Sequence, residues 1–305
     1  MRIVSLLPSL TELVAALGSG AELVGVTHEC DEPPEVASLP RLTRSRIPES
    51  ATSAEIDTLV AEQGGSLYEL DVALLGALRP DLILTQAQCD VCAVNEATVR
   101  RTATALPNAP HVVSVNPTDL DGVFAMVRSV AQALGTTAEI EAERWIGTFL
   151  ASWAEIMSRL VRARRAPRRV ALLEWFDPPY SSGHWNPDLV VRAGGFEVLA
   201  ASGERSRRRT WEEIEDTSPE VILLVPCGFT LERATEELPT LLARPEWQRL
   251  TPHQVALIDG SAYFSRPGPR LETSLRVAAA AIHPDLASDL APPVGQGWRW
   301  VQEPR

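Results

Sequence analysis

The sequence contains no lysine: all 28 basic residues among its 305 residues are arginine. The absence of lysine excludes chemistry that proceeds through a lysine Schiff base. Acidic residues number 40, and the resulting net charge of −12 disfavours nucleic acid and anionic lipid as partners. No run approaches the roughly 20 apolar residues that a membrane-spanning helix needs, so we expect no membrane insertion. A small-molecule ligand is the partner class that these numbers favour.

Motifs for nucleotides and for hydrolase chemistry are missing as well. The sequence has no Gly-x-Gly-x-x-Gly pattern, no phosphate-binding loop and no Gly-x-Ser-x-Gly elbow. Aromatic residues are scarce in the first part of the chain: residues 1–118 hold one, Tyr68, whereas residues 168–283 hold ten. This asymmetry predicts that a ligand site built from both parts has one polar and one aromatic wall.

The N-terminal apolar run, residues 3–7, follows one arginine and superficially resembles a secretion signal. Pro8 interrupts the run, Glu12 follows it, and no Ala-x-Ala cleavage pattern lies at the right distance. We therefore expect a core strand here and a cytoplasmic protein. In that reducing compartment the four cysteines are expected to be free thiols or ligands rather than disulfides.

Short apolar runs alternate with helical segments along most of the chain. Strands are expected at 3–7, 22–27, 79–85, 111–115, 168–175, 219–225 and 254–259. Strands separated by helices predict βα units and parallel sheets. Ser9-Leu-Thr-Glu12 and Ser66-Leu-Tyr-Glu69 both match the capping-box pattern, which predicts that each opens a helix, the second one reaching Leu78.

Residues 119–165 contain no strand pattern and repeat apolar residues at helical spacing. One helix from about Thr137 to Arg162, roughly 40 Å long, is expected there. The predicted fold class is α/β, with two similar lobes, each a central, mostly parallel sheet flanked by helices, joined by this long rigid helix. The expected divisions are an N-terminal lobe (1–118), a helical segment (119–166), a C-terminal lobe (167–283) and a Pro-rich surface tail (284–305).

Ligands of parallel α/β sheets bind beyond the carboxyl ends of the strands. In both lobes, residues near expected strand ends are therefore the candidates for ligand binding. They are Ser9, Glu29, Cys30, Gln86, Gln88, Cys89, Trp175, His184, Trp185, Phe229, Tyr263 and Arg266. Across a cleft between the lobes they suit a flat, partly apolar ligand with polar edges. Some of the aromatic residues are alternatively core residues, since large rings are mostly buried.

Cys89 and Cys92 form a Cys-x-x-Cys pattern just after an expected strand. As metal ligands they would need partners such as His184, because a zinc site usually has four ligands and no second Cys-x-x-Cys exists. As a redox pair they would need a helix starting near Val91 to lower a thiol pKa. As small residues they would simply line the cleft. All three interpretations stay open, with zinc or iron as the possible metal.

Several passages, in order, resemble the type III (cluster A) solute-binding proteins, which have one long connecting helix. They are "RIVSLLPSLTELVAALG", "LVGVTHECDEPPE", "LRPDLILT", "SSGHWNPDLVVRAGG" and "AYFSRPGPRL". These proteins deliver cobalamin, heme or ferric siderophores to ABC importers, and the chain is most similar to the vitamin B12-binding branch. The resemblance spans Arg2 to about His283. It implies a corrinoid held between two rigid lobes, with Trp175, Tyr263 and Arg266 at matching binding positions.

The chain departs from the family pattern at both ligand and docking positions. Glu29 and Gln86 stand where the B12 binders tend to have aromatic side chains. The family docks on its transporter through one surface glutamate per lobe, and here Glu212 matches one position whereas Ala73 occupies the other. These departures favour a non-enzymatic cytoplasmic protein that binds a cobalamin-like corrinoid or a related metal chelate.

Two alternatives are kept beside this interpretation. One is a metal- or thiol-dependent enzyme that uses the same scaffold, with Glu29, Cys89, Cys92 and His184 in its site. The other is the substrate-binding protein of an ABC importer.

Overall fold

The computed structural model describes residues 1–48, 51–63, 67–87 and 94–304. The chain divides into two compact units. The first unit comprises Met1–Ala51, Glu55–Pro117 and Asp121–Ile146, and the second comprises Thr52–Ala54, Thr118–Leu120 and Gly147–Arg305.

The first unit is built on a sheet with strand order β2-β1-β5-β6. Its strands are β1 (Ile3–Ser5), β2 (Leu23–Gly25), β5 (Leu82–Gln86) and β6 (His111–Val115). Each neighbouring pair runs parallel, which confirms the α/β prediction for this part of the chain. The inner strands β1 and β5 are buried along their whole length, which explains why their sequences are nearly continuous apolar runs.

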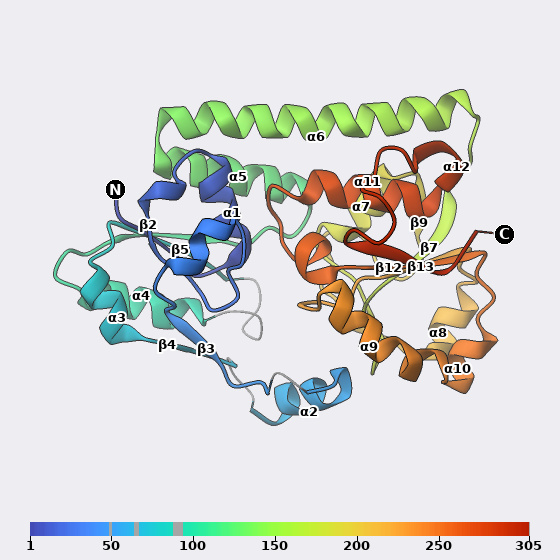
Figure 1. Ribbon diagram of the computed structural model, residues 1–305, viewed down its shortest axis with the longest axis horizontal. Helices are drawn as coiled ribbons and strands as arrows, with labels where there is room; N and C mark the ends of the chain where they lie inside the picture. Colours follow the sequence, from blue (N-terminus) through green and yellow to red (C-terminus); the bar gives the residue numbers. More distant parts are fainter. Residues whose placement is uncertain (49–50, 64–66, 88–93, 305) are drawn as a thin grey trace. The chain divides into compact units, whose positions relative to one another are not determined.

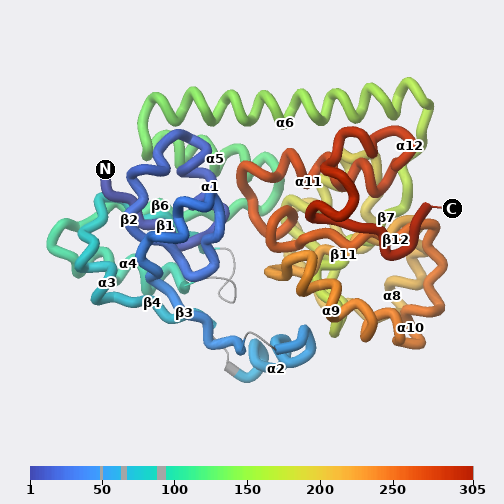
Figure 2. Tube along the Cα trace, viewed as in Figure 1, coloured from blue at the N-terminus to red at the C-terminus, as the bar shows by residue number. Residues whose placement is uncertain are grey.

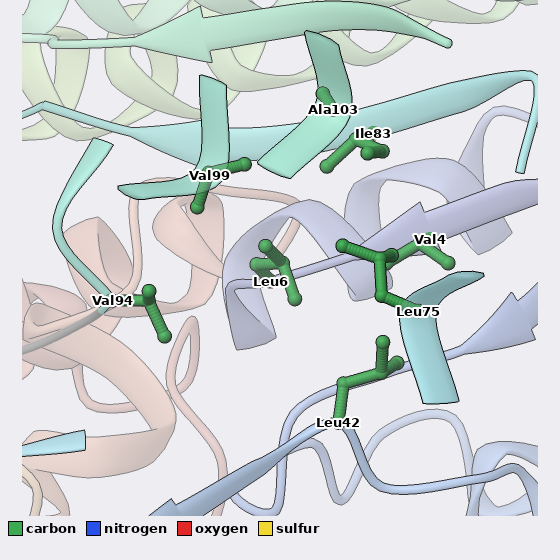
Figure 3. Packing of buried hydrophobic residues seen from close by; sticks show 8 residues of the cluster. All are labelled: Val4, Leu6, Leu42, Leu75, Ile83, Val94, Val99 and Ala103. Atoms are coloured by element: carbon green, nitrogen blue, oxygen red, sulfur yellow. The ribbon is translucent and has the colours of Figure 1, made fainter. Parts of the chain in front are cut away.

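The first half of the chain also contains a set of helices. They are α1 (Pro8–Ala16), the 3₁₀ helices η1 (Gly20–Glu22) and η2 (Pro34–Ser38), α2 (Ser53–Gln63), α3 (Val72–Leu78), α4 (Glu96–Ala105) and α5 (Leu120–Leu134). A buried apolar cluster joins β1 and β5 to α3 and α4 (Figure 3). Its members are Val4, Leu6, Leu42, Leu75, Ile83, Val94, Val99 and Ala103. Burial of each of the larger side chains stabilises the unit by about 1.5–3 kcal/mol.

Both predicted capping boxes of the first half are wrong. Helix α1 has Leu7 at its N-cap and no side-chain cap, because Pro8 at the first helical position starts the helix one residue before Ser9. Tyr68–Leu70 is not helical but forms strand β4, which pairs antiparallel with β3 (Thr43–Ser45). Figure 2 labels these two segments beside one another. Helix α3 begins only after Asp71, whose carboxylate accepts a hydrogen bond from the helix backbone at 2.9 Å.

Helix α6 (Thr136–Arg162) runs unbroken through 27 residues, as the sequence predicted (Figure 1). The boundary between the two units falls inside this helix, between Ile146 and Gly147. Among the described residues, no helix is both long and apolar enough to cross a membrane.

The second unit is built on a sheet with strand order β10-β8-β7-β11-β12-β13, and β9 also pairs with β7. The strands are β7 (Arg168–Trp175), β8 (Tyr180–Ser181), β9 (Gly195–Glu197), β10 (Arg207–Arg208), β11 (Val221–Leu224), β12 (Gln254–Ile258) and β13 (Trp298–Gln302). Strands β7, β11 and β12 run parallel at its centre, whereas β8 and β13 run antiparallel to their neighbours.

The second unit has its own set of helices. They are α7 (Asn186–Arg192), α8 (Trp211–Asp216), α9 (Leu231–Leu242), α10 (Pro245–Arg249), the π-helical turn η3 (Gly260–Phe264), α11 (Leu271–Ile282) and α12 (Pro284–Ala287). Two of the α-helices have side-chain caps at their first turn. Thr210 forms a complete capping box at α8, and the Thr230 hydroxyl accepts a hydrogen bond at the start of α9.

The C-terminal segment is part of this sheet and not a surface tail. Strand β13 pairs antiparallel with β12, beside which Figure 1 draws it. The Trp298 side chain is buried, and its Nε1 donates a hydrogen bond to the Pro292 carbonyl at 2.8 Å. The prolines before this segment suggested a tail, but "WRWVQ" itself has the alternating and aromatic composition of an edge strand.

Candidate functional site

A small pocket lies at the carboxyl ends of β1 and β2 in the first unit. We name it the first-unit pocket. It is lined by Leu6, Pro8, Thr27, His28, Glu29, Thr43, Tyr68 and Val94. Because these residues follow β1, β2 and β5 or lie on β3 and β4, the parallel order of the strands brings them together at one edge.

Thr43 fixes the position of His28 in this pocket. The backbone N–H of His28 donates to Thr43 Oγ1 at 3.1 Å, and the ring Nδ1 lies 2.7 Å from the same oxygen. Burial lowers the pKa of His28, Glu29 opposes this shift, and Arg41 adds to it. The imidazole is therefore neutral at pH 7, with its Nε2 atom 4.0 Å from Glu29 Oε1.

Tyr68, on strand β4, contacts both Glu29 and His28 in the pocket. Its hydroxyl donates to Glu29 Oε1 at 2.8 Å, and its ring lies 5.2 Å from the His28 ring. An imidazole, a carboxylate and a phenol thus converge above an apolar floor that includes Leu6 and Val94. These groups exchange hydrogen bonds with polar ligand edges, and their nitrogen and oxygen atoms can bind a metal.

Hydrogen bonds from Arg41 and contacts of the buried Cys30 fix the loop that carries His28 and Glu29. Arg41 Nη1 donates to the carbonyls of Thr27 and Cys30 at 2.9 and 2.6 Å. Cys30 Sγ is buried and lies 3.1 Å from Thr11 Oγ1 and 3.2 Å from Thr27 Oγ1. Cys30 therefore stabilises the loop from the interior and is not among the residues that line the pocket.

The other first-half candidates lie apart from this pocket or outside the described residues. Ser9 and Gln86 are both buried, and neither lines it. Gln88, Cys89 and Cys92 fall in the range 88–93, outside the described residues, so the metal, redox and cleft-lining interpretations stay predictions. Within the described part of the chain, α4 begins at Glu96 with Asn95 as its cap, later than the expected start near Val91.

The second unit places an aromatic pair at the carboxyl ends of β7 and β11. The rings of Trp175 and Phe229 lie 5.1 Å apart at 58°. The Arg233 guanidinium lies 4.9 Å above the Phe229 ring, on the helix that follows β11. We name Trp175, Phe229 and Arg233 the second-unit aromatic group.

Residues after β12 join the surroundings of this group. The Ser261 N–H donates to the Phe229 carbonyl at 3.0 Å, and Arg266 Nη2 donates to Ser261 Oγ at 3.1 Å. Arg266 is buried. The sequence-predicted residues Phe229 and Arg266 are thus connected through Ser261, which the sequence did not indicate.

Tyr263 is held by the C-terminal segment. Gly297 has φ +77°, and a Cβ there would lie 2.7 Å from the Tyr263 hydroxyl, so glycine is required for this close approach. Burial, with Asp259 nearby, raises the pKa of Tyr263 and keeps its phenol neutral. The ring is a candidate ligand contact whose position depends on the strand that the tail forms.

His184 and Trp185 lie away from the carboxyl ends. Strand β8 runs antiparallel to β7, so the chain beyond it moves back along β7, where the Ser182 N–H donates to the Leu172 carbonyl. Trp185 is buried, which fits the core alternative for this ring. Burial, and then Arg205, lowers the pKa of His184. Among the described residues, no group of three or more His, Cys, Asp or Glu is placed to hold a metal ion.

Sequence reasoning missed Tyr68, Thr43 and Arg233 as site residues. Tyr68 gave a signal, since it is the only aromatic residue in 1–118, but the capping-box pattern assigned it to a helix. The sequence around Thr43 gave no signal for a site residue, because β3 is a short strand inside a polar stretch. Arg233 was hidden by its place on a helix, four residues before its partner Glu237.

Two α/β units with polar and aromatic groups at their strand ends define the class of solute-binding proteins. The model of the family described as "Periplasmic binding protein" matches residues 3–254. The chain therefore belongs to the periplasmic binding protein family. No curated protein matches the chain significantly.

Solved structures agree with this assignment. A periplasmic heme-binding protein from Pseudomonas aeruginosa superposes with a TM-score of 0.71 at 17% identity, covering 100% of this chain and 98% of that one. The apo heme-binding protein RhuT from Roseiflexus sp. RS-1 gives 0.64 at 25% identity, covering 94% and 98%. The vitamin B12-binding protein BtuF of Vibrio cholerae gives 0.66 at 18% identity, covering 92% and 96%. The resemblance to these proteins is one of fold.

Proposed function

We propose that this solute-binding protein holds a cobalamin-like corrinoid or a related metal chelate, such as a heme, without changing it chemically. The observation that carries the proposal is the pairing of polar and aromatic chemistry at strand ends. The first unit presents an imidazole, a carboxylate and a phenol, and the second presents an indole–phenyl pair with a guanidinium. A flat chelate has rings to stack and polar groups along its edge, and each of these two kinds of surface suits one of those features.

In the first unit, the protonation states suit a chelated metal or its polar edge. His28 is neutral, and if its Nδ1 donates to Thr43 Oγ1 then Nε2 carries the free lone pair. An imidazole nitrogen or a phenol oxygen can bind cobalt or iron at an open axial position. The Glu29 carboxylate orients the Tyr68 hydroxyl and accepts hydrogen bonds from amide side groups.

In the second unit, the aromatic group supplies stacking area and a cation. Trp175 presents an indole ring with one N–H donor, and Arg233 carries a positive charge beside Phe229. Carbonyl or carboxylate groups on a ligand edge are the acceptors that these donors recognise. Support also comes from the related folds, among which are proteins described as binding heme and vitamin B12.

Titration with aquocobalamin and with hemin tests the proposal. Purified protein is expected to bind one of them stoichiometrically, with a shift of the visible absorption bands when a protein group reaches the metal. His28→Ala should weaken that binding by about tenfold or more and abolish the shift, since one good contact is worth roughly 1.4 kcal/mol. His111→Ala is the matched control, because His111 is exposed at the start of β6.

Two results would count against this function. The first is no binding of either chromophore. The second is protein purified from its native host with stoichiometric zinc or iron and no visible chromophore, with the metal lost on Cys89→Ser, which would favour the metal-dependent alternative.

We also propose that the protein acts in the cytoplasm and does not dock on an importer through paired glutamates. The apolar run at 3–7 contains β1, an inner strand of the first sheet, which supports its role as core structure. Glu212 is exposed on α8, and the position matching its counterpart is the exposed Ala73. Fractionation of the native host with an antibody against the protein is expected to place it with cytoplasmic markers, and a periplasmic location would overturn this proposal.

A further inference from the structure

A short segment from the first part of the chain belongs to the second unit. Thr52–Ala54 groups with the second unit, although the residues on both sides of it belong to the first. It contains the first residue of helix α2, Ser53, which is only 4% exposed. We name Thr52–Ala54 the strap.

Hydrogen bonds, an ion pair and ring contacts join the strap to the second-unit aromatic group. Trp175 Nε1 donates to the Ser53 carbonyl at 3.1 Å, and the Ser53 N–H donates to Glu237 Oε1 at 2.9 Å. Glu237 Oε1 also accepts from Arg233 Nη2 at 2.7 Å. The Arg233 guanidinium lies 4.9 Å from the Phe229 ring centre, and the Phe229 and Trp175 ring centres are 5.1 Å apart. The contacts therefore link all five residues in a ring that begins and ends at Trp175.

Glu237 is the residue best placed to hold the strap. Its carboxylate lies at the first N–H of α2, where a helix has unpaired donors and favours negative charge. Its side chain is 11% exposed, so solvent weakens these contacts little. The neighbouring Glu236 is 72% exposed and lies 3.4 Å from the same arginine.

With the strap bound, the second-unit aromatic group has little exposed ring surface and its hydrogen-bond donors already have partners. Phe229 is only 7% exposed, with Trp175 and Arg233 against its ring. The indole N–H of Trp175 is engaged by the Ser53 carbonyl, and Arg233 is engaged by Glu237. When Ser53 leaves, the Trp175 indole N–H loses its acceptor and Glu237 Oε1 loses one of its two donors, next to Arg233 and Phe229.

We propose that the strap is displaced by the ligand, so that Glu237 controls access to the second-unit aromatic group. In this exchange a carbonyl or carboxylate oxygen on the ligand edge takes the place of the Ser53 carbonyl on Trp175 Nε1. A ligand carboxylate also competes with Glu237 for Arg233. The ligand class is a planar conjugated molecule with carbonyl acceptors along its edge. The inference rests on the proposed function, because it takes Trp175 and Phe229 as ligand contacts.

Cleavage after Glu55 by a glutamate-specific protease reports release of the strap. Glu55 lies one residue beyond the strap in the first turn of α2, and a protease cuts a helix only when it opens locally. Without ligand, Glu237→Ala should speed this cleavage by about tenfold, the typical effect of losing one helix-end contact. Glu236→Ala, the matched control, should stay within about twofold of the parent protein.

Trp175→Phe is a second variant that keeps the ring and removes only the donor to Ser53. It should speed cleavage by about threefold, since one neutral hydrogen bond is lost. Aquocobalamin or hemin, whichever binds, should speed cleavage of the parent protein and associate faster with Glu237→Ala than with Glu236→Ala. Circular dichroism of each variant checks that the fold is retained.

The outcomes separate the strap from the ligand. Equal cleavage rates for Glu237→Ala and Glu236→Ala, with the rate for Trp175→Phe also unchanged, would show that Glu237 and Trp175 do not hold the strap. Slower cleavage of the parent protein with bound chromophore would overturn displacement, because the ligand would then close the strap. If neither chromophore binds, the proposed function fails, and the comparison of the ligand-free variants still decides whether Glu237 holds the strap.

Discussion

The two units share a parallel α/β design but carry different chemistry at the carboxyl ends of their strands. In the first unit, the short strands β3 and β4 add Thr43 and Tyr68 to a polar pocket beside His28 and Glu29. In the second unit, the longer strand β7 ends in an indole that packs on Phe229. The shared layout positions a site, and the segments added around each sheet determine what that site can bind.

The units also differ in how their sheets end. Among the described residues, the first sheet pairs its strands only in parallel, from β2 to β6. The second sheet gains antiparallel strands at both sides, β8 with β10 and the C-terminal β13. Because Gly297, just before β13, lies against the Tyr263 ring, a segment far along the chain takes part in positioning a candidate ligand residue.

The largest expected effect comes from removing the anchor of β13. Trp298→Ala deletes a fully buried indole and should destabilise the second unit by about 3–5 kcal/mol. The first unit, which has no part in this contact, should keep its hydrogen-exchange protection. Phe196→Ala is the control, because Phe196 is 56% exposed and should change stability by less than about 0.5 kcal/mol. Equal loss of protection in both units would show that they do not unfold independently.

A buried carboxyl group makes the stability of the second unit depend on pH. Glu197 accepts hydrogen bonds from the Leu199 and Leu172 N–H groups, yet burial raises its pKa to about 8 from an ordinary value of 4.5. The folded state therefore binds the proton more tightly than the unfolded state does. The contribution to stability is full below pH 4.5 and is lost as the pH rises through 8, by up to about 4 kcal/mol.

Urea unfolding of the second unit between pH 5 and 8.5 measures this loss. Glu197→Gln should flatten the fall in unfolding free energy, because the amide does not ionise. The exposed Glu236→Gln should retain it. A parent protein whose second unit is equally stable at both ends of this range would contradict the assignment.

The smallest effect concerns the hydroxyl that fixes His28. Thr43→Val keeps the shape of the side chain but leaves the His28 N–H without its acceptor, which should cost the first unit about 1–2 kcal/mol. Binding of the chromophore should weaken about threefold to tenfold as the imidazole loses its orientation. Thr43→Ser restores the hydroxyl and should behave like the parent protein in both measurements. If the parent protein, Thr43→Val and Thr43→Ser bind the chromophore equally well, the orientation of His28 by Thr43 does not contribute to ligand binding.

The sequence predicted the repeated, regular parts of this fold. Parallel strands and the long helix α6 follow from local periodicity, which acts over a few residues. The family resemblance likewise rests on ordered local passages and is confirmed at the level of the family.

The parts that the sequence did not predict depend on distant partners. Tyr68 became a strand residue because β3 lies beside it, and β13 became an edge strand because β12 offers an open side. His184 was grouped with the strand ends because nothing local reveals that β8 turns back along β7. Trp175 and Phe229 were both expected near strand ends, but Ser53 between Trp175 and Glu237 was not expected.

The place of β1 inside the first sheet has a consequence for synthesis on the ribosome. Ile3 pairs with Leu82, so β1 has one of its neighbours only after some 79 further residues have been made. At about 5–20 residues per second, this wait lasts roughly 4–16 s. During that interval the nascent chain carries an apolar strand with one side open, where a chaperone or a neighbouring chain can bind.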